Sequence, residues 1–334
     1  MENLIDIEAS EQFFGTLADL GRTEDIKFSP NNERLAIACF HANAIVVIEL
    51  LAGLAANESK VQIGEWIQIV SPVLDQPHGV TFLDSNTIAV ANRGASVEIF
   101  DLSDITGARG RHSCSPIRTI RDTGKAPMKS PGSVSSFHLG DGLYEILVCN
   151  NYVNMVNRYV VDSMDACRVI ESDVLLRKLL DVPDGVAVSS ENQWIAVSNH
   201  NTKCVLLYDH ANPLNIMSLP SGLLRDLEYP HGICFSDDQK WIMVADAGEP
   251  CIKFYASGDN GWHGMHEPVY SLQAVSDAAF AAGHYSEEEG GPKGIDLAAG
   301  SRVLAVTCEH QPLAFFDLSE IFDGHGVSAQ AAKA

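Results

Sequence analysis

A strand–turn–strand pattern recurs six times along this chain of 334 residues. Each copy opens with a polar residue, a small residue and a β-branched residue, passes through a polar turn and reaches a short apolar run. The six openings are Glu24-Asp25-Ile26, His78-Gly79-Val80, Gly132-Ser133-Val134, Asp184-Gly185-Val186, His231-Gly232-Ile233 and Lys293-Gly294-Ile295. Because a fixed period of about 20–50 residues is the signature of repeat architectures, this pattern limits the possible folds more than any other feature.

The apolar run of each copy predicts a buried strand. The six runs are LAIAC, TIAVAN, EILVCN, WIAVSN, WIMVAD and VLAVTC. Such short, nearly continuous apolar runs are typical of strands that are covered on both faces. Four-stranded units of this length stack around an axis in β-propellers. We therefore predict an all-β fold, a six-bladed β-propeller with four-stranded antiparallel blades, in which residues 1–334 form a single domain.

The boundaries of the repeats also predict how the ring closes. The repeats lie near residues 22–70, 76–125, 130–180, 182–228, 229–290 and 292–320. The last repeat ends before a convincing fourth strand, so we expect an N-terminal strand from Phe13 to Leu20 to complete it and close the ring. The tail after His325 is expected to be frayed. A doubly wound α/β fold is the alternative, but it requires helices between strands, and most connections here are short turns.

Charge and composition narrow the classes of function. The formal net charge is −22, and a field of this sign repels phosphate backbones, so no nucleic-acid partner is expected. No run of about 18 apolar residues is present, so no membrane span is expected. The first residues, MENLIDIEASEQFF, lack the basic and apolar regions of a secretory signal, and several of the eight cysteines fall in apolar runs. We therefore expect a cytoplasmic protein with buried, reduced thiols.

Two of the repeats carry a family resemblance: PHGVTFLDSNTIAVANRGASVEIFDL and PHGICFSDDQKWIMVADAGEPCIKFY. They resemble NHL repeats, and they are similar to blades of the gluconolactonase/senescence-marker superfamily and of the streptogramin lyases. The resemblance covers roughly residues 22–318 and implies a six-bladed propeller. Some of these relatives hold a divalent metal on the axis for lactone hydrolysis or ring-opening elimination, whereas NHL modules mainly bind partners. Because one fold hosts several functions, the activity must be argued from the site.

Equivalent positions of the repeats should stack into rings around the channel. The residues that open the innermost strands form a first ring of Glu24, His78, Gly132, Asp184, His231 and Lys293. The residues that follow the second strands form a second ring of Cys39, Asn92, Asn150, Asn199, Asp246 and Cys308. Their next neighbours form a third set of Phe40, Arg93, Asn151, His200, Ala247 and Glu309.

The first two rings contain side chains that bind divalent metals. Carboxylates and imidazoles suit zinc or manganese, whereas the amide oxygens of asparagine suit calcium or magnesium, so the expected cofactor is one of these four ions. In the gluconolactonase-like relatives the ligands are Glu, Asn and Asp at comparable blade positions. That resemblance implies a metal site among Glu24, Asp184, Asn150, Asn199 and Asp246. The alternative is that such residues only cap strand ends and bind channel water, and Lys293 would repel a nearby cation.

A metal at the axis would polarise a carbonyl group or activate a bound water. His78, His231 or the pair Glu309-His310 would then act as the general base, and this pair resembles a Glu-His pair in streptogramin lyases. Substrate contacts are expected from Arg93, His200, Lys293 and Trp262. No P-loop, GxSxG elbow, CxxC pair or HExxH motif is present in the sequence, so no nucleotide cofactor is expected.

Two segments outside the rings offer recognition surfaces. Residues 104–130 hold six basic side chains in an otherwise acidic chain, namely Arg109, Arg111, Arg118, Arg121, Lys125 and Lys129. The longest insertion runs from Ser257 to Pro292 and contains Trp262 and a predicted helix near Leu272 to Ala282. Both segments are candidates for contact with a partner, and both are also compatible with plain solvated loops.

Two hypotheses about function follow. The first is a metal-assisted enzyme, a lactone-type hydrolase or a lyase, that acts on a small organic substrate at the axis. The second is a non-catalytic propeller scaffold that binds a protein or peptide partner through the basic segment and the long insertion. Binding of a divalent metal distinguishes the two, because only the first requires it.

Overall fold

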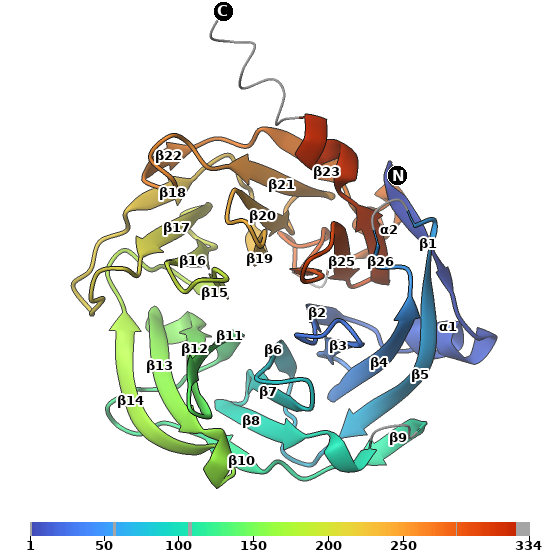
Figure 1. Cartoon of the computed structure of the whole chain (residues 1–334), viewed down its shortest axis with the longest axis horizontal. Helices are drawn as coiled ribbons and strands as arrows, with labels where there is room; N and C mark the ends of the chain where they lie inside the picture. The colour runs from blue at the N-terminus through green and yellow to red at the C-terminus, as the bar shows by residue number, and fades with distance from the viewer. Residues whose placement is uncertain (1, 56–57, 106–108, 285, 325–334) are drawn as a thin grey trace, which may run out of the picture.

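The structure is a computed structural model that describes residues 2–55, 58–105, 109–284 and 286–324. Strands dominate it, and they are arranged radially in sheets around a central axis, in the manner of a β-propeller (Figure 1). The chain passes round this axis in order, from the blue strands of the N-terminal part to the red strands of the C-terminal part. The predicted all-β, propeller-like fold is therefore confirmed, and the doubly wound alternative is wrong.

Four sheets of four or five strands succeed one another around the axis. The first contains, from the axis outward, β6 (Pro77–Phe82), β7 (Thr87–Asn92), β8 (Ser96–Asp101) and β10 (Arg118–Ile120). The second contains β11 (Pro131–Gly140), β12 (Leu143–Asn150), β13 (Met155–Asp162) and β14 (Arg168–Leu176). The third contains β15 (Pro183–Val188), β16 (Trp194–Asn199), β17 (Cys204–Asp209), β18 (Gly222–Leu224) and β22 (Gly264–His266). The fourth contains β19 (Pro230–Phe235), β20 (Trp241–Asp246), β21 (Cys251–Ala256) and β23 (Tyr270–Gln273).

The fifth sheet has nine strands, and β1 (Leu4–Glu8) lies in the middle of it. On one side β1 pairs antiparallel with β26, and this side contains β26 (Gln311–Asp317), β25 (Val303–Cys308) and β24 (Gly294–Leu297). On the other side β1 pairs parallel with β5, and this side contains β5 (Lys60–Val70), β4 (Ala44–Ala52), β3 (Arg34–Cys39) and β2 (Thr23–Phe28), with β9 (Gly110–Ser113) also paired to β5.

The hydrogen bonds differ from the predicted six separate blades. They give five sheets among the described residues, because β1 joins the strands of the first repeat to those of the last. The predicted closing strand from Phe13 to Leu20 is wrong, since most of it lies in helix α1 (Glu11–Ala18). Ser10 caps this helix by accepting a bond from the backbone N–H of Phe13, and the i, i+4 pair Phe13 and Leu17 is buried. The position next to β26 belongs instead to β1.

The core lies between neighbouring sheets. Strands β20 and β25 are buried at every position, which explains why the second strand of each repeat is nearly all apolar. One cluster packs Ile45 and Val47 of β4 against Val80 of β6 and Ile88 of β7. Other clusters join the remaining neighbouring sheets in the same way. All eight cysteines are free and seven of them are buried, so the prediction of core thiols is confirmed.

The innermost strands approach one another closely around the axis. A Cβ atom on Gly185 would lie 2.0 Å from the carbonyl oxygen of His231, and one on Gly294 would lie 2.5 Å from the Cα of Asp25. Only glycine permits backbones to come this close. Because the residue before each of these glycines opens a repeat, the close approach brings the opening residues together.

Short helical elements complete the regular secondary structure of the described residues. They are α2 (Asp277–Ala282) and the 3-10 turns η1 (Ser103–Ile105), η2 (Asn151–Val153) and η3 (Ser163–Asp165). The helix predicted near Leu272 to Ala282 is therefore shorter than expected, because its first residues belong to β23 and Ser276 caps α2. No helix in the described ranges has both the length and the apolar character that crossing a bilayer requires. The tail from His325 onward lies outside the described residues.

Candidate functional site

Five of the six opening residues bring their side chains together at the axis. Glu24, His78, Asp184, His231 and Lys293 are each at most 3% exposed. His78 Nε2 lies 3.4 Å from Glu24 Oε2, and the nearly parallel rings of His78 and His231 are 5.6 Å apart. The sixth opening residue is a glycine and contributes no side chain. The structure thus places residues of five repeats in one buried cluster, as the stacking of equivalent positions predicted.

Asp184 is the centre of one half of this cluster. Its Oδ1 accepts hydrogen bonds from Arg93 Nη2 at 2.8 Å and from Asn151 Nδ2 at 2.7 Å. Its Oδ2 faces His231 Nδ1 at 3.0 Å and His200 Nε2 at 3.6 Å. His200 is 4% exposed, and its Nε2 has no hydrogen-bond partner within the described part of the chain. One oxygen of Asp184 therefore binds two donors, while the other faces two imidazole nitrogens.

Glu24 is the centre of the other half, which is a closed network of ion pairs. Arg22 Nε donates to Glu24, and Arg22 Nη2 donates to Glu289 Oε2 at 2.9 Å. Lys293 Nζ donates to Glu289 and lies 3.6 Å from Glu24 Oε2. All four side chains are buried. Two cations and two carboxylates neutralise one another here, as burial of charge requires.

His78 lies between the two halves with both ring nitrogens engaged. Arg93 Nη2 donates to His78 Nε2 at 2.8 Å, so the hydrogen-bond network assigns the proton to Nδ1, which lies 3.1 Å from the carbonyl oxygen of Gly132. Burial, followed by the charge of Arg93, lowers the pKa of His78 well below its usual value. The placement of His78 indicates that it holds Arg93 in position, and leaves no free nitrogen for the predicted role of general base.

Two central residues, Arg22 and Glu289, were not among the predicted site residues. Arg22 lies two positions before an opening residue, and Glu289 ends an acidic run in the long insertion, which was predicted to be a recognition loop or a solvated loop. Their side chains bond across 267 positions of the sequence. Glu289 also forms an ion pair with Lys293, but no helix spans these two residues, so their spacing of four did not signal the contact.

The third set of residues lies at the mouth of the channel and is held there by strained backbone. Three residues that each precede a proline adopt the left-handed region, Gln76 (φ 55°), Ser130 (φ 52°) and Val182 (φ 53°). Their carbonyl oxygens accept bonds from the backbone N–H groups of the third set, namely Arg93, Asn151 and His200. This conformation is costly for a side chain other than glycine, most of all for a β-branched one, and such strain clusters at functional sites.

The second ring holds strand ends together instead of facing the cluster. Oxygen atoms of Asn150, Asn199 and Asp246 accept bonds of 2.7–3.2 Å from backbone N–H groups of the preceding loops. The donors are the backbones of Lys129, Asp181, Glu228 and Tyr229. The geometry therefore does not bring these three side chains to the predicted metal site, and it supports the alternative in which they cap strand ends.

The remaining predicted residues lie outside the cluster. Trp262 is buried in the core, where its Nε1 donates to the carbonyl oxygen of Gln239 at the far end of the strands, so the predicted substrate contact is wrong. Glu309 lies near Arg22 at the mouth, close enough for its charge to act on the guanidinium. Burial alone would lower the pKa of Arg22, but the charges of Glu24, Glu289 and Glu309 together raise it. His310 packs beside Gly283.

The imidazoles around Asp184 are neutral at physiological pH. Burial lowers the pKa of His200, and it lowers the pKa of His231 to about 3, against the opposing effect of Asp184. Burial alone would raise the pKa of Asp184, but the three imidazoles and Arg93 hold it well below its usual range. The site therefore combines an ionised carboxylate with neutral ring nitrogens, which are the ligating forms of both groups.

Replacement of His231 by glutamine is expected to weaken the pH dependence of stability in metal-free protein. In the unfolded chain an imidazole takes up a proton near pH 6.5, whereas folded His231 does so only at about 3. Between these values the unfolded state binds more protons, so the stabilising contribution of His231 is lost as the pH falls. Between about pH 7 and pH 5 the free energy of unfolding should fall by about 2 kcal/mol more in the wild type than in His231→Gln. Urea unfolding at both pH values measures this, and equal decreases would contradict it.

Two adjoining cavities open above the cluster. The larger has a volume of about 710 Å³, and its walls include Arg22, Arg93, His200 and Glu289. The smaller has a volume of about 400 Å³ and shares His200 and Tyr229 with the larger. Both lie where the second strands end, so this mouth of the channel combines buried charge with accessible space.

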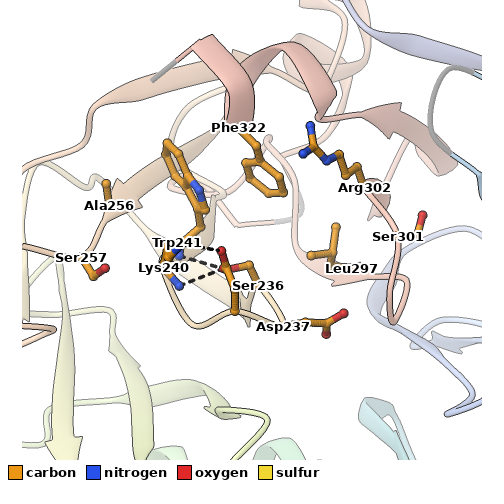
Figure 2. Close-up of a pocket in the computed structure, with 11 residues that line it drawn as sticks. Ser236, Asp237, Lys240, Trp241, Ala256, Ser257, Leu297, Ser301, Arg302 and Phe322 are labelled. Atoms are coloured by element: carbon orange, nitrogen blue, oxygen red, sulfur yellow. Dashed lines mark hydrogen bonds and ion pairs between the residues drawn. The ribbon is translucent and has the colours of Figure 1, made fainter. Parts of the chain in front are cut away.

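A further cavity, of about 460 Å³, lies at the opposite ends of the strands (Figure 2). Figure 2 shows Trp241 and Phe322 beside Leu297, with the two aromatic rings stacked 5.2 Å apart. Among the described residues that line it, none is a predicted catalytic, substrate-binding or metal-binding residue. The cluster of predicted site residues therefore lies at the other end of the strands, beside the two cavities described above.

Two groups of side chains at the axis have the composition of a metal site. The donor atoms of Asp184, His200 and His231 lie within 4.8 Å of one another. Two imidazoles and a carboxylate are typical of zinc, manganese and iron sites that keep open positions. The buried Nε2 of His200 has no hydrogen-bond partner among the residues that the structure describes, and it lies 3.6 Å from Asp184 Oδ2, so these two atoms fit such an ion.

The second group, Glu24, His78 and His231, fits a metal less well. Arg22 donates to Glu24, and Lys293 lies 3.6 Å from it. A divalent ion there would have to displace cations that already neutralise the carboxylate. The donor set around Asp184 is therefore the better candidate.

Comparisons with known proteins support the fold and do not indicate an activity. A scan against protein-family models found no match, and a search of curated proteins found none either. Among solved structures, the chain is similar to the crystal structure of a functionally unknown protein from Desulfotomaculum acetoxidans. The two are 12% identical, the alignment covers 89% of this chain and 86% of that chain, and the TM-score is 0.53. At this identity the similarity shows a shared fold alone, and the resemblance to NHL and gluconolactonase-like proteins stays a prediction.

Proposed function

We propose that this protein is a metal-dependent enzyme, a hydrolase or a lyase, that acts on a small organic substrate at the mouth of the channel. The observation that carries the proposal is the donor set of Asp184, His200 and His231 beside a cavity of about 710 Å³. A pocket that contains convergent polar groups with strongly perturbed pKa values is a typical candidate for an active site.

The residues around the donor set orient it. When bound, a divalent metal supplies a Lewis acid that polarises a carbonyl group of the substrate. Arg93 and Asn151 hold Oδ1 of Asp184, which leaves Oδ2 directed at the imidazoles. The ring of Tyr229 lies 4.0 Å from that of His200 and fixes its position. Such outer partners orient ligands and tune their affinity.

Glu289 plays a different part in this proposal. Burial would raise its pKa, but Lys293, His231 and Arg22 lower it. An ionised carboxylate with so low an affinity for protons is a poor general base. Glu289 instead positions Arg22 and Lys293 at the floor of the cavity.

We also propose that the wheel has six structural units. In this division the nine-stranded sheet contributes two units, one of β2 to β5 and one of β24 to β26 with β1. The antiparallel pairing of β1 with β26, against its parallel pairing with β5, supports the division, because strands within a propeller blade are antiparallel. The sixfold sequence repeat supports it independently.

Metal titration of the full chain tests the proposed function. After treatment with a chelator, the protein should bind one equivalent of Zn²⁺ or Mn²⁺ in a calorimetric titration. Replacing His200 by alanine removes one ligand and should weaken the binding at least about 100-fold. The matched control is His138→Ala, which removes an exposed imidazole of β11 and should leave the affinity unchanged.

Two results would contradict the proposed function. One is no binding of Zn²⁺, Mn²⁺, Ca²⁺ or Mg²⁺ to the wild type. The other is an unchanged affinity in His200→Ala. The first result would favour the second hypothesis, in which the chain is a scaffold that binds a protein or peptide partner. The second result would mean that His200 is not a ligand and that the proposed donor set is wrong.

A further inference from the structure

The two cavities at the mouth carry opposite charges. We call the larger one the basic lobe, because three cations, Arg22, Arg93 and Lys129, line it against one carboxylate, that of Glu289. We call the smaller one the acidic lobe, because Glu228, Glu287 and Glu288 line it. A ligand that fills both lobes therefore meets cations at one end and carboxylates at the other.

The basic lobe offers an uncommitted cation. Lys129 is exposed and forms no ion pair within the described part of the chain. Its backbone is fixed, since its N–H donates to Asn150 Oδ1 at 3.1 Å. Arg93 lies on the same wall, where its Nη1 donates to the carbonyl oxygen of Ser130 at 3.3 Å. Tyr152, which is 71% exposed, adds an aromatic surface to this lobe.

The acidic lobe offers uncommitted carboxylates. Glu287 and Glu288 are exposed, and neither forms an ion pair with another described residue. Glu228 is paired with Lys203 at 2.6 Å, so these two charges cancel. The lobe therefore keeps an excess of negative charge that suits an ammonium group.

His200 and Tyr229 separate the two lobes, and both lobes share them. The Nε2 of His200 is buried without a hydrogen-bond partner among the described residues, which marks the boundary as a place where a ligand group or an ion completes the structure. A group that connects the two ends of a ligand would lie beside this nitrogen.

We propose that the mouth binds a small zwitterion of about dipeptide size, with its carboxylate in the basic lobe, its ammonium in the acidic lobe and its connecting group beside His200. The size of the proposed ligand follows from the volumes of the two lobes, about 710 and 400 Å³, of which a single amino acid would fill only a small part. This inference rests on the proposed function, since it names the substrate class of the same site.

Three peptides that differ only in end charge test the inference. They are alanyl-phenylalanine, its N-acetyl form and its C-terminal amide, titrated calorimetrically into the full chain at about pH 7, where both free ends are charged. The zwitterion should bind at least about tenfold more tightly than either blocked form, because each block removes one charge-assisted contact.

Two variants assign each charge to its lobe. Lys129→Gln should bind alanyl-phenylalanine and its C-terminal amide equally well. Glu288→Gln should bind alanyl-phenylalanine and its N-acetyl form equally well. The matched controls are Lys125→Gln and Glu191→Gln, which change exposed charges outside both lobes and should keep the tenfold preference. All four variants should bind metal like the wild type.

The outcomes separate this inference from the proposed function. Equal affinities for the three peptides, no detectable binding of any of them, or an unchanged preference in both Lys129→Gln and Glu288→Gln would overturn the zwitterion proposal. If the peptides are distinguished but no metal binds, the proposed metal chemistry fails while the recognition stands. If metal binds but the peptides are not distinguished, the zwitterion proposal fails while the proposed metal site stands.

Discussion

Replacing Glu24 by alanine is expected to lower the free energy of unfolding by about 3–5 kcal/mol. The carboxylate is fully buried, binds Arg22 and lies 3.6 Å from Lys293. Without it, the two buried cations Arg22 and Lys293 would have to share the carboxylate of Glu289. Removal of one member of a buried ion pair leaves a charge without compensation, which costs more than the pair itself contributes. Urea unfolding of the purified variant measures the loss.

A double-mutant cycle shows whether this loss comes from the network. Glu24→Gln and Lys293→Met each leave an unbalanced buried charge, whereas the double variant removes one charge of each sign. The sum of the stability losses of the two single variants should therefore exceed the stability loss of the double variant by about 1–3 kcal/mol. A loss below about 1 kcal/mol in Glu24→Ala, or full additivity in the cycle, would mean that the network does not stabilise the fold.

Replacing Asp184 by alanine is expected to have a comparable effect on stability and a larger one on metal binding. The side chain accepts bonds from Arg93 and Asn151 and faces two imidazoles, so its loss should cost about 3–5 kcal/mol of stability. It should also reduce the affinity for Zn²⁺ or Mn²⁺ at least about 100-fold, because the only carboxylate of the donor set is gone. Urea unfolding and calorimetric titration measure the two effects separately.

The variant Asp184→Asn distinguishes the structural part from the ligand part. Its amide keeps the shape of the side chain and one oxygen for Asn151, so it should lose less stability than the alanine variant. Its affinity for metal should fall as far as that of the alanine variant, because the negative charge is lost in both. If Asp184→Asn binds metal like the wild type, Asp184 is a structural residue and the donor set is wrongly chosen.

The sequence predicted the radial arrangement and the meeting of the opening residues, because both follow from the period of the repeat. Residues at equivalent positions of a closed or nearly closed wheel must face the same axis, whatever their identity. This is why Glu24 and Asp184 could be placed in one cluster, although they open the first and the fourth repeat and lie far apart along the chain.

Other features were ambiguous because one residue type serves two purposes. Asparagine after a strand is both a metal ligand and a cap, and only the positions of the backbone N–H groups show that Asn150 and Asn199 are caps. The apolar spacing of Phe13 and Leu17 fits an outer strand and a helix, and the capping Ser10 decides for the helix. Trp262 fills the core, although an aromatic residue in a long insertion also fits a recognition loop.

Residues that act through partners outside the repeat were missed altogether. Arg22 and Glu289 do not occupy ring positions. Their ion pair joins the first repeat to the long insertion that precedes the last repeat. Periodicity describes what repeats have in common, so it carries no information about contacts that occur once.

The position of β1 has a consequence for the order of folding during synthesis. Leu4 and Ile5 leave the ribosome long before their partners in β26, Phe316 and Phe315. The same delay applies to the ion pair of Arg22 with Glu289, whereas Glu24, the other acidic partner of Arg22, is made at almost the same time. A nascent chain can form the central sheets early and can pair β1 with β5, but one edge of β1 stays unpaired until β26 has been made.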